Sequence, residues 1–386
     1  MTISNAIVVG GGIGGLAVAA ALARGGLAVT LIEQAGKLQE VGAGLQVSPN
    51  GMCVLRALGV ASGLIQKGGV RGQAVVLRDY KVGKEVARLD LNRLKKRQEY
   101  YFLHRADLID VLAGAAKRQN VTFEMGAQVA SIRPGAVPQV QMSDGSTRRA
   151  ELVVAADGIH SVARPVLNGA DDAQFTGQVA WRAVVPNELE HPDEAHVTMG
   201  PGRHLVSYPI RDGAQVNIVA VEERKSWAAE GWNHPDDPEN LRQAFAAFGG
   251  DAKSLLRSVE RVSLWGLHRH PVARNWGRDG VALLGDAAHP TLPFLAQGAN
   301  MALEDAWVLA QSVLRGGADA IATYQARRHA RVTRVINAAN SNAGRYHLRP
   351  GPVRTAAHLA LGIGSKLAPG KMLGAYDWLY GMDVTA

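Results

Sequence analysis

The sequence predicts an α/β fold in which a domain built on a parallel sheet is interrupted by a β-rich domain and followed by C-terminal helices. Three observations support this fold class. A strand, a glycine-rich turn, a helix and a second strand follow one another within residues 6–33. Strand-like segments separated by Gly, Pro and Asp turns fill residues 171–270. A buried strand and a long helix then return after residue 280.

The length of 386 residues is more than one compact core needs and fits two domains. We predict a discontinuous first domain, a β-rich second domain and a helical C-terminal segment. Their residues are 1–70, 100–170 and 271–340 for the first, 71–99 and 171–270 for the second, and 341–386 for the last.

Composition argues against several classes of protein. Hydrophobic residues make up 47% and charged residues 20% of the chain, as is usual for globular proteins. No uncharged apolar run of about 20 residues occurs, and the N-terminus lacks the basic segment of a signal peptide. Cys53 is the only cysteine, which suits a reducing cytoplasm. The net charge of +8 comes from scattered residues and favours anionic small molecules over nucleic acid as partners.

The first motif lies near the N-terminus. Ala6–Val9 predicts a strand, Leu16–Ala23 is rich in Ala and Leu and predicts a helix, and Ala28–Ile32 predicts a second strand that ends at Glu33. Gly10–Gly15 connects the first strand to the helix. A unit of this length and order is typical of dinucleotide binding.

Gly10, Gly12 and Gly15 fit the pattern G-x-G-x-x-G, and each glycine has a mechanical role. The first allows a tight turn, the second lets the backbone approach a pyrophosphate, and the third lets helix and strand pack closely. The pyrophosphate then lies at the positive end of the helix, and Glu33 can accept hydrogen bonds from a ribose. The loop alone does not distinguish FAD from NAD.

Two further motifs follow predicted strands. Asp157–Arg164 comes after the strand Leu152–Ala155, and Gly285–Pro290 comes after the strand Val281–Leu284. Each motif places an acid beside glycine at the carboxyl end of a strand, where α/β sheets bind ligands. Each alone is typical of an ordinary turn, but the three motifs in this order indicate a cofactor site.

Other segments predict the elements between and after these motifs. We predict helices at Ala106–Lys117 and Gly298–Val313 and a strand at Val121–Phe123. In the β-rich region, His196–Met199 and Gln215–Val221 predict strands of an antiparallel sheet.

The run Gly285–Ala306, GDAAHPTLPFLAQGANMALEDA, completes a pattern with the two earlier motifs. With it, the chain resembles the single-component FAD-dependent aromatic hydroxylases, or group A flavoprotein monooxygenases, and especially their salicylate hydroxylase-like branch. That branch includes 3-hydroxybenzoate 6-hydroxylases and 6-hydroxynicotinate monooxygenases. His104–Leu108, Tyr346–Leu348 and Asp377–Tyr380 also match, so the resemblance covers nearly the whole chain, with residues 171–270 the least constrained.

The resemblance implies a Rossmann-like FAD-binding domain, a β-rich substrate domain and FAD that is bound without a covalent link. Asp286 would bind the ribityl chain, and the backbone at the start of the following helix would meet the flavin ring, where the helix dipole stabilises reduced, anionic flavin. The stretch from Asp157 to Arg164 would serve FAD and the nicotinamide donor. The residues implied to bind the cofactor are Gly10, Gly12, Gly14, Gly15, Glu33, Arg105, Val129, Asp157, Asp286, Gly298, Ala299 and Asn300.

The resemblance also implies a reaction and its small-molecule partners. NADH would reduce the flavin, reduced flavin and O₂ would form a C4a-hydroperoxide, and this species would hydroxylate an electron-rich ring. The implied substrate is a phenolic aromatic or a hydroxypyridine carboxylate, similar to salicylate, 3-hydroxybenzoate or 6-hydroxynicotinate. We expect NADH rather than NADPH because no arginine cluster is placed to bind a 2′-phosphate. A monomer or a homodimer is expected.

His204 and Tyr208 are the candidate catalytic residues. The segment between them predicts a strand, so both side chains lie on one face. A base near a phenol favours the more nucleophilic phenolate, and histidine titrates near neutral pH. The same His-x₃-Tyr spacing occurs in the resembling hydroxylases. The alternative is an ordinary sheet face on which both residues are structural.

Other polar residues have weaker claims to a role. Arg182 can offset a substrate carboxylate, Gln46 can line the pocket, and His289 is expected to shape a turn. His268 and His270 share a strand face where relatives commonly have acids around an arginine, so a structural acid–base pair there is in doubt. A metal pair stays open, but no further Cys, His or carboxylate cluster supports it, and we predict no metal site.

Two alternatives to a hydroxylase stay open. One is a flavin oxidoreductase that does not hydroxylate an arene, such as an epoxidase or a halogenase, although the Trp-x-Trp-x-Ile-Pro signature of flavin halogenases is absent. The other is a catalytically silent FAD-binding protein. NADH oxidation with and without phenols separates them, because only a hydroxylase accelerates with the right phenol and forms product.

Overall fold

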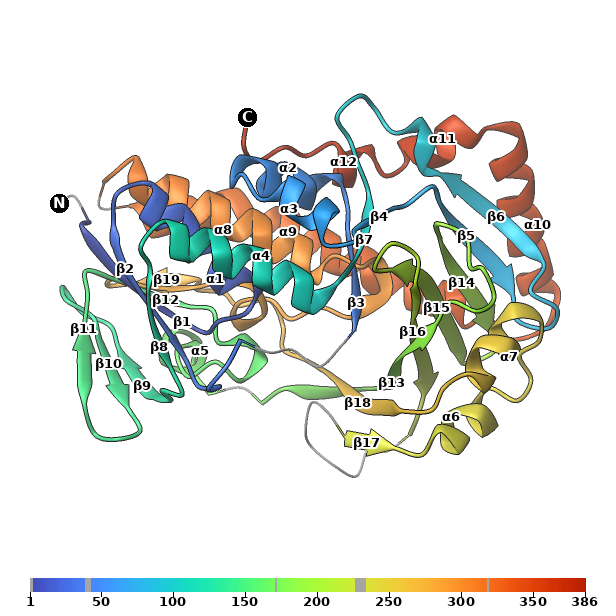
Figure 1. Cartoon of the computed structure of the whole chain (residues 1–386), viewed down its shortest axis with the longest axis horizontal. Coiled ribbons are helices and arrows are strands. Elements are labelled where there is room, and N and C mark those ends of the chain that lie inside the picture. Colours follow the sequence, from blue (N-terminus) through green and yellow to red (C-terminus); the bar gives the residue numbers. More distant parts are fainter. Residues whose placement is uncertain (1–2, 39–42, 171, 226–233, 318) are drawn as a thin grey trace.

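The computed structural model describes residues 3–38, 43–170, 172–225, 234–317 and 319–386. This part of the chain forms two large sheets, two small three-stranded sheets and a long C-terminal helical region (Figure 1). The predicted α/β class, with a Rossmann-like sheet, a separate β-rich unit and C-terminal helices, is confirmed.

The Rossmann-like sheet has six strands: β1 (Asn5–Val9), β2 (Ala28–Glu33), β8 (Thr122–Met125), β12 (Leu152–Ala155), β19 (Gly277–Arg278) and β20 (Val281–Leu283). Their order is β19-β20-β12-β1-β2-β8, and all neighbours are parallel except β19 and β20. β1, β12 and β20 are almost wholly buried, as expected for parallel strands that are covered on both faces.

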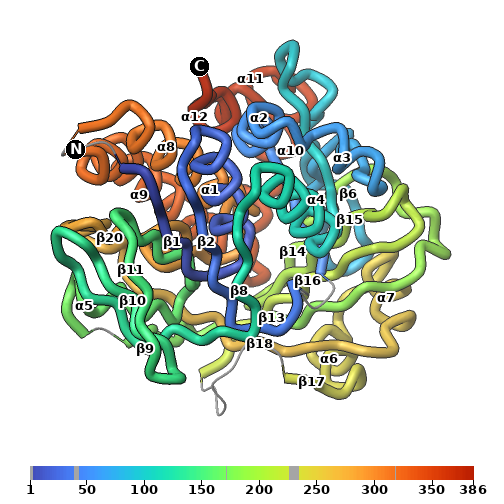
Figure 2. The backbone as a smooth tube through the Cα atoms, turned by 60° about the vertical axis from the view of Figure 1, so that its left-hand side comes forward, coloured from blue at the N-terminus to red at the C-terminus, as the bar shows by residue number. Residues whose placement is uncertain are grey.

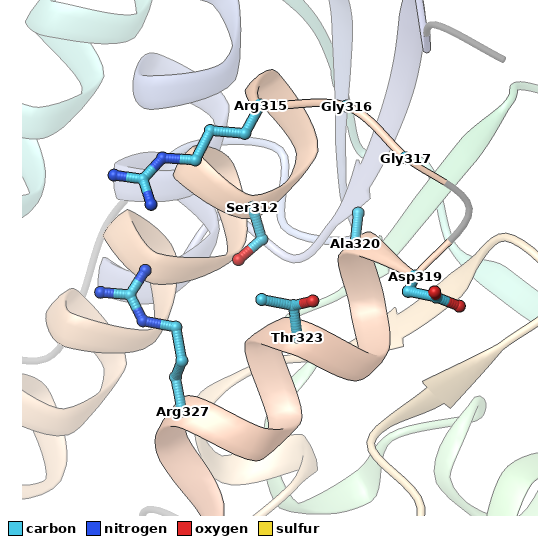
Figure 3. A pocket seen from close by; sticks show the side chains of 8 residues that line it. All are labelled: Ser312, Arg315, Gly316, Gly317, Asp319, Ala320, Thr323 and Arg327. Atoms are coloured by element: carbon cyan, nitrogen blue, oxygen red, sulfur yellow. The ribbon is translucent and has the colours of Figure 1, made fainter.

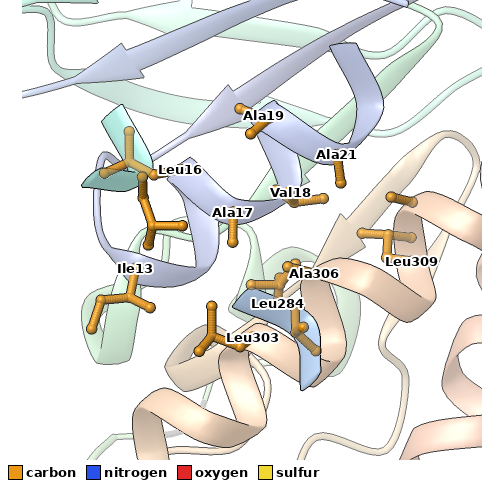
Figure 4. Packing of buried hydrophobic residues seen from close by; sticks show 14 of the residues in the cluster. Ile13, Leu16, Ala17, Val18, Ala19, Ala21, Leu284, Leu303, Ala306 and Leu309 are labelled. Carbon is orange, nitrogen blue, oxygen red and sulfur yellow. The ribbon is translucent and has the colours of Figure 1, made fainter. Parts of the chain in front are cut away.

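Three helices pack side by side against this sheet: α1 (Ile13–Arg24), α4 (Arg105–Arg118) and α8 (Gly298–Leu314) (Figure 1). The structure confirms all three predicted helices and extends them by one to three residues at their ends. α1 is buried over its first ten residues because it lies between the other two helices. Its small alanine side chains let Leu303 and Leu309 of α8 approach closely (Figure 4).

A three-stranded sheet, which the sequence did not predict, lies beside the Rossmann-like sheet (Figure 2). Its strands are β9 (Val129–Arg133), β10 (Gln139–Met142) and β11 (Thr147–Arg149). Ile132, Val140 and Met142 belong to the same hydrophobic core as β1 and α1. A second small sheet, also unpredicted, consists of β3 (Gly44–Val47), β4 (Val70–Arg71) and β7 (Tyr101–His104).

The β-rich unit is an eight-stranded sheet in the order β17-β18-β13-β16-β15-β14-β5-β6. Its strands are β5 (Ala74–Asp79), β6 (Glu85–Asp90), β13 (Gln174–Pro186), β14 (Glu194–Gly200), β15 (Arg203–Ile210), β16 (Gln215–Glu223), β17 (His234–Asp236) and β18 (Val262–Arg269). The expected antiparallel pairing holds throughout except between β14 and β5, which are parallel. The exception arises because β5 joins the sheet from a distant part of the chain.

Two short helices, α6 (Pro238–Ala244) and α7 (Gly250–Arg257), interrupt the β-rich stretch and were not predicted. Leu241, Leu255 and the adjacent Phe245 bury their side chains with Trp181 and Leu205 of the sheet. Helices of this length are unstable alone, so tertiary packing rather than local propensity decides that they form.

The C-terminal region contains α9 (Ala320–Tyr346), α10 (Pro352–Leu367), α11 (Pro369–Gly374) and α12 (Asp377–Tyr380). α9 packs against α8, and α10 packs along β6 (Figure 1). The remaining helices are α2 (Pro49–Ala57), α3 (Ala61–Gln66) and α5 (Arg164–Asn168), with short 3₁₀ turns η1 (Leu91–Arg93), η2 (Gly158–His160), η3 (Gly285–Ala287) and η4 (Pro293–Leu295). Among the described residues, no helix is both long and apolar enough to cross a membrane.

A buried ion network joins α8 to α9. Arg328 of α9 pairs with Glu304 and, at 2.7 Å, with Asp305 of α8, and all three side chains are at most 1% exposed. Arg331 adds a second contact of 2.7 Å to Glu304. Burial raises the pKa values of both carboxyl groups, but the neighbouring cations more than offset this, so both pKa values end below their usual range.

We predict that Arg328→Met lowers the free energy of unfolding by about 3–5 kcal/mol, because it leaves two buried carboxylates short of a positive partner. Urea denaturation followed by circular dichroism measures this loss. Arg327→Met is the matched control, since Arg327 is the exposed neighbour on the same helix and its loss should change stability by less than about 0.5 kcal/mol. Equal unfolding curves for the two variants would contradict the role of the network.

We also predict opposite outcomes for two glycines of the N-terminal loop. A Cβ at Gly15 would lie 1.9 Å from the carbonyl oxygen of Gly10, so Gly15→Ala should destabilise the protein by roughly 1–3 kcal/mol or more. A Cβ at Gly12 would meet no protein atom within 4 Å, so Gly12→Ala should unfold like the wild type. Thermal unfolding of protein freed of small molecules compares them, and a stable Gly15→Ala variant would show that helix and strand can separate.

Candidate functional site

Three loops and one acidic side chain meet at the carboxyl edge of the Rossmann-like sheet. β1 leads into Gly10–Gly15, β2 ends at Glu33, β12 leads to Asp157, and β20 leads to Gly285 and Asp286. Because these strands are parallel neighbours, their carboxyl ends lie together. The structure therefore brings together the three motifs that the sequence singled out.

The N-terminal glycine loop has the geometry of an anion-binding turn. Gly10 has a φ of +102°, and a Cβ there would lie 2.4 Å from the carbonyl oxygen of Ala156. Glu33 accepts a hydrogen bond of 2.6 Å from the N–H of Gly11, which fixes its carboxylate beside the loop. A Cβ at Gly12 would meet no protein atom within 4 Å, so space remains in front of the α1 N-terminus.

Gly14 and Val129 have different environments within this region. A Cβ at Gly14 would lie 2.5 Å from Leu284, so this glycine serves the approach of α1 to the strand end. Val129 begins β9, and the preceding segment passes the end of β2, where the N–H of Ala127 donates to the carbonyl of Glu33 at 3.0 Å. Val129 is thus on the same edge as Glu33.

The second motif combines an under-satisfied acid with a structural arginine. Asp157 accepts a 2.9 Å hydrogen bond from the N–H of Val162, while its Oδ1 is buried without a hydrogen-bond partner among the described residues. Burial raises the pKa of Asp157. Arg164 is buried and donates to the carbonyl oxygens of Ala287 and Ala288 at 3.2 and 3.1 Å, which ties the second motif to the third.

Asp286, Arg105 and Arg182 form an electrostatic group that spans both large sheets. The side chain of Asp286 is exposed, yet the surrounding protein still limits its hydration and raises its pKa, an effect that His289 and Arg105 oppose. Burial and the nearby Arg182 lower the pKa of Arg105 to about 10. Arg182 of β13 stacks on Trp265, 4.5 Å from the ring centroid, and its Nε is buried without a hydrogen-bond partner among the described residues.

The start of α8 is fixed by the side chain of Asn300. Its amide donates to the carbonyl oxygens of Gln46 and Ala296 at 3.1 and 2.8 Å, and its Oδ1 accepts from the N–H of Ser48 at 3.1 Å. The backbone N–H groups of the first helical turn, at Gly298 to Asn300, lie at the positive end of a 17-residue helix. This turn can stabilise negative charge on a bound group.

His204 and Tyr208 lie on β15 and share the face that turns away from α6 and α7, whose core takes Leu205. They are four positions apart, which corresponds to roughly 13 Å along a strand. Tyr208 contacts Phe102, with ring centroids 5.2 Å apart. His204 packs against Phe294 at 5.4 Å, in the loop between Asp286 and α8. The structure therefore places each candidate beside a different part of the site.

His204 belongs to a chain of polar groups that sequence analysis did not identify. Its Nδ1 lies 2.7 Å from Nε2 of His347, and Nδ1 of His347 lies 2.8 Å from a carboxylate oxygen of Glu223. Burial and the neighbouring His347 lower the pKa of His204 well below its usual value. The imidazole is therefore neutral at neutral pH and can accept a proton.

Several weaker candidates have defined structural contacts. His289 is buried and lies 2.5 Å from Asp305, and Gln46 accepts a hydrogen bond of 2.7 Å from the hydroxyl of Tyr100. His268 bonds the carbonyl of Gly266. Within the described ranges, no group of three or more His, Cys, Asp or Glu side chains could hold a metal ion.

A surface pocket of about 350 Å³ lies at the opposite end of α8 from these motifs (Figure 3). It is lined by Ser312, Arg315, Gly316, Gly317, Asp319, Ala320, Thr323 and Arg327. The 17 residues of α8 separate it from the first turn by roughly 20–25 Å. This pocket is therefore not part of the site at the sheet edge.

Comparison with known proteins agrees with this geometry. A family model described as an FAD binding domain matches residues 4–339. A 3-amino-4-hydroxybenzoate 2-monooxygenase of Streptomyces platensis is 35% identical over 389 residues, which cover 97% of this chain and 95% of that one. A 3-hydroxybenzoate 6-hydroxylase of Klebsiella oxytoca is 32% identical, with 98% and 97% covered.

A solved structure with a closely similar fold is a salicylate hydroxylase substrate complex, with a TM-score of 0.82 and 25% identity over 99% of this chain and 96% of that one. The two monooxygenases that are 35% and 32% identical to this chain also match almost its full length. The protein therefore belongs to the FAD-dependent aromatic hydroxylases, the group A flavoprotein monooxygenases, in their salicylate hydroxylase-like branch.

Proposed function

We propose that this protein hydroxylates a phenolic aromatic carboxylate, or a hydroxypyridine carboxylate, with NADH and O₂ as co-substrates. One observation carries the proposal. His204, a buried and neutral imidazole, packs against Phe294 in the loop that joins Asp286 to the first turn of α8. This contact puts a neutral imidazole beside the loop that follows Asp286, which supports His204 as the base that activates the phenol.

The residues at the sheet edge fit FAD. The space at Gly12 and the N-terminus of α1 suit the pyrophosphate, and the carboxylate of Glu33 beside this loop supports its assignment to the adenosine ribose. Val129 lies on the same edge. The buried Oδ1 of Asp157 has no hydrogen-bond partner among the described residues and can accept a hydrogen bond from the cofactor. Asp286 would bind the ribityl chain. The other residues in this assignment are Gly10, Gly14, Gly15, Arg105, Gly298, Ala299 and Asn300.

Bound FAD supplies the redox chemistry that activates O₂ for electrophilic attack on the ring. The protein's own residues prepare the substrate. Nε2 of His204 accepts the phenolic proton, which makes the ring more electron-rich, and Tyr208 holds the ring on the same sheet face. The cationic Arg182, whose Nε has no partner among the described residues, offsets the substrate carboxylate.

In this proposal the cofactor domain consists of residues 1–70, 100–170 and 271–340, and residues 71–99 and 171–270 form the substrate domain. We propose that the protein is a monomer or a homodimer in solution. The close relatives support a substrate with both a hydroxyl and a carboxylate, because the names of both matched enzymes specify a hydroxybenzoate.

The test is a substrate panel of 3-amino-4-hydroxybenzoate, 3-hydroxybenzoate, salicylate and 6-hydroxynicotinate. NADH oxidation should be slow alone and fast with the right compound. Mass spectrometry should find a product that is one oxygen heavier or, if decarboxylation accompanies hydroxylation, a product in which a hydroxyl group replaces the carboxyl group. NADH should exceed NADPH in kcat/KM. Oxidation without hydroxylated product would favour another flavin oxidoreductase, and no oxidation would favour a silent FAD-binding protein.

We predict that Asp286→Ala weakens FAD binding by about 1.5–3 kcal/mol, the value of a hydrogen bond to a charged group, and leaves the fold intact. Fluorescence titration of apo protein with FAD gives the dissociation constant. Gly12→Ala should also weaken binding, because its methyl group would fill space reserved for the pyrophosphate. Unchanged affinity in both variants would show that the edge does not hold FAD.

We predict that His204→Ala slows hydroxylation by roughly 10²–10⁴-fold, the usual contribution of a general base, while FAD content stays at the wild-type level. The share of NADH lost to peroxide should rise. Tyr208→Phe should reduce substrate affinity or coupling more mildly. Product and peroxide are quantified together, and wild-type rates with wild-type coupling in both variants would place the base elsewhere.

A further inference from the structure

A continuous chain of hydrogen bonds runs from His204 to the protein surface. Nδ1 of His204 lies 2.7 Å from Nε2 of His347, and Nδ1 of His347 lies 2.8 Å from Oε1 of Glu223. His204 is 1% exposed and His347 is 6% exposed, whereas the side chain of Glu223 is 49% exposed. The chain therefore connects the buried face of β15 with solvent.

The carboxylate at the outer end fixes the proton positions along the chain. Glu223 accepts a hydrogen bond, so Nδ1 of His347 carries a proton and its Nε2 presents a lone pair. That lone pair accepts the proton on Nδ1 of His204. Nε2 of His204 is then unprotonated, and it has no hydrogen-bond partner within the described ranges. The chain thus prepares His204 as a base at its inner nitrogen.

The groups around the chain keep both imidazoles neutral. Burial lowers the pKa of His347, Glu223 raises it, and Arg203 of β15 lowers it again. Arg203 itself pairs with Glu222 at 3.2 Å. Tyr346, whose ring lies 5.3 Å from His204, has a pKa raised by burial and stays protonated. Neutral imidazoles can pass a proton without accumulating a buried charge.

We infer that His204, His347 and Glu223 form a relay that carries the phenolic proton from the substrate to solvent. The inference rests on the proposed function, since it needs a phenol at His204. The phenolic O–H bond breaks as an N–H bond forms at Nε2 of His204. His204 releases its Nδ1 proton to His347, which releases its own Nδ1 proton to the carboxylate of Glu223, and Glu223 then loses the proton to water.

A relay is needed because, among the described residues, the hydrogen bond to His347 is the only one that connects His204 with the surface. The buried imidazole would otherwise retain the proton as an imidazolium in an apolar environment, which is costly. His347 is held in line independently of its ring, because its carbonyl accepts a hydrogen bond of 3.2 Å from the N–H of Gly202. In this scheme His347 and Glu223 are positioning and relay residues, and only His204 contacts the substrate.

The test follows proton release when a phenol binds to the FAD-loaded enzyme, without NADH. The probe is 3-amino-4-hydroxybenzoate or 3-hydroxybenzoate, whichever the wild type hydroxylates. Stopped-flow absorbance of phenol red in weakly buffered solution records the proton. His347→Gln and Glu223→Gln should release it at least about tenfold more slowly than the wild type, with unchanged FAD content. Glu222→Gln, a change at the adjacent acid on β16, is the matched control and should release it at the wild-type rate.

Rescue distinguishes a relay from a structural contact. Because Glu223 is at the surface, added imidazole buffer should restore proton release in Glu223→Gln in proportion to its concentration. Wild-type release in both relay variants, or slow release that no buffer accelerates, would overturn the relay. Failure of the wild type to hydroxylate either phenol would instead overturn the proposed function. If only His204→Ala lost hydroxylation, and both relay variants released the proton at the wild-type rate, His204 would remain the base but the relay would be overturned.

Discussion

The architecture of the site depends on the buried pairing of Arg328 with Glu304 and Asp305. Asp305 also holds His289 and accepts from the N–H of Gly285 at 3.3 Å, so the loop that carries Asp286 is fixed to α8. Asp305 thus fixes the position of the third motif, Gly285–Pro290, relative to α8, the helix that follows it. Because the charges are buried, losing one partner leaves another uncompensated, and the arrangement has little freedom to relax.

The same network extends to the rest of the site through Asn50 and α9. Asn50 of α2 donates to Glu304 at 2.6 Å and to Gln297, just before the first turn of α8, at 3.1 Å. From Arg328, α9 continues for roughly five turns to its end at Tyr346, where His347 meets β15. One helix therefore joins the ion network of the Rossmann-like sheet to the proton relay of the β-rich sheet.

Local patterns predicted most of the Rossmann-like unit. Gly10 requires a positive φ and Gly15 a close approach that few other residues allow, whereas Gly12 leaves space in front of the α1 N-terminus, so the spacing of the three specifies the turn. The apolar run of β1 and the Ala-rich α1 predict a buried strand and helix for the same reason. The short helices α6 and α7, the small sheets and the parallel pairing of β14 with β5 were missed, because they form through contacts with distant parts of the chain.

The sequence by itself determined the fold class, the three motifs and the shared face of His204 and Tyr208, because each follows from the period of a helix or strand or from the chemistry of adjacent residues. The tertiary structure alone decided that Glu304 and Asp305 are paired, that Arg182 lies near Arg105, and that His347 and Glu223 extend the reach of His204. His204 and His347 are 143 positions apart, and no local pattern records a contact between residues that only the folded chain brings within 2.7 Å.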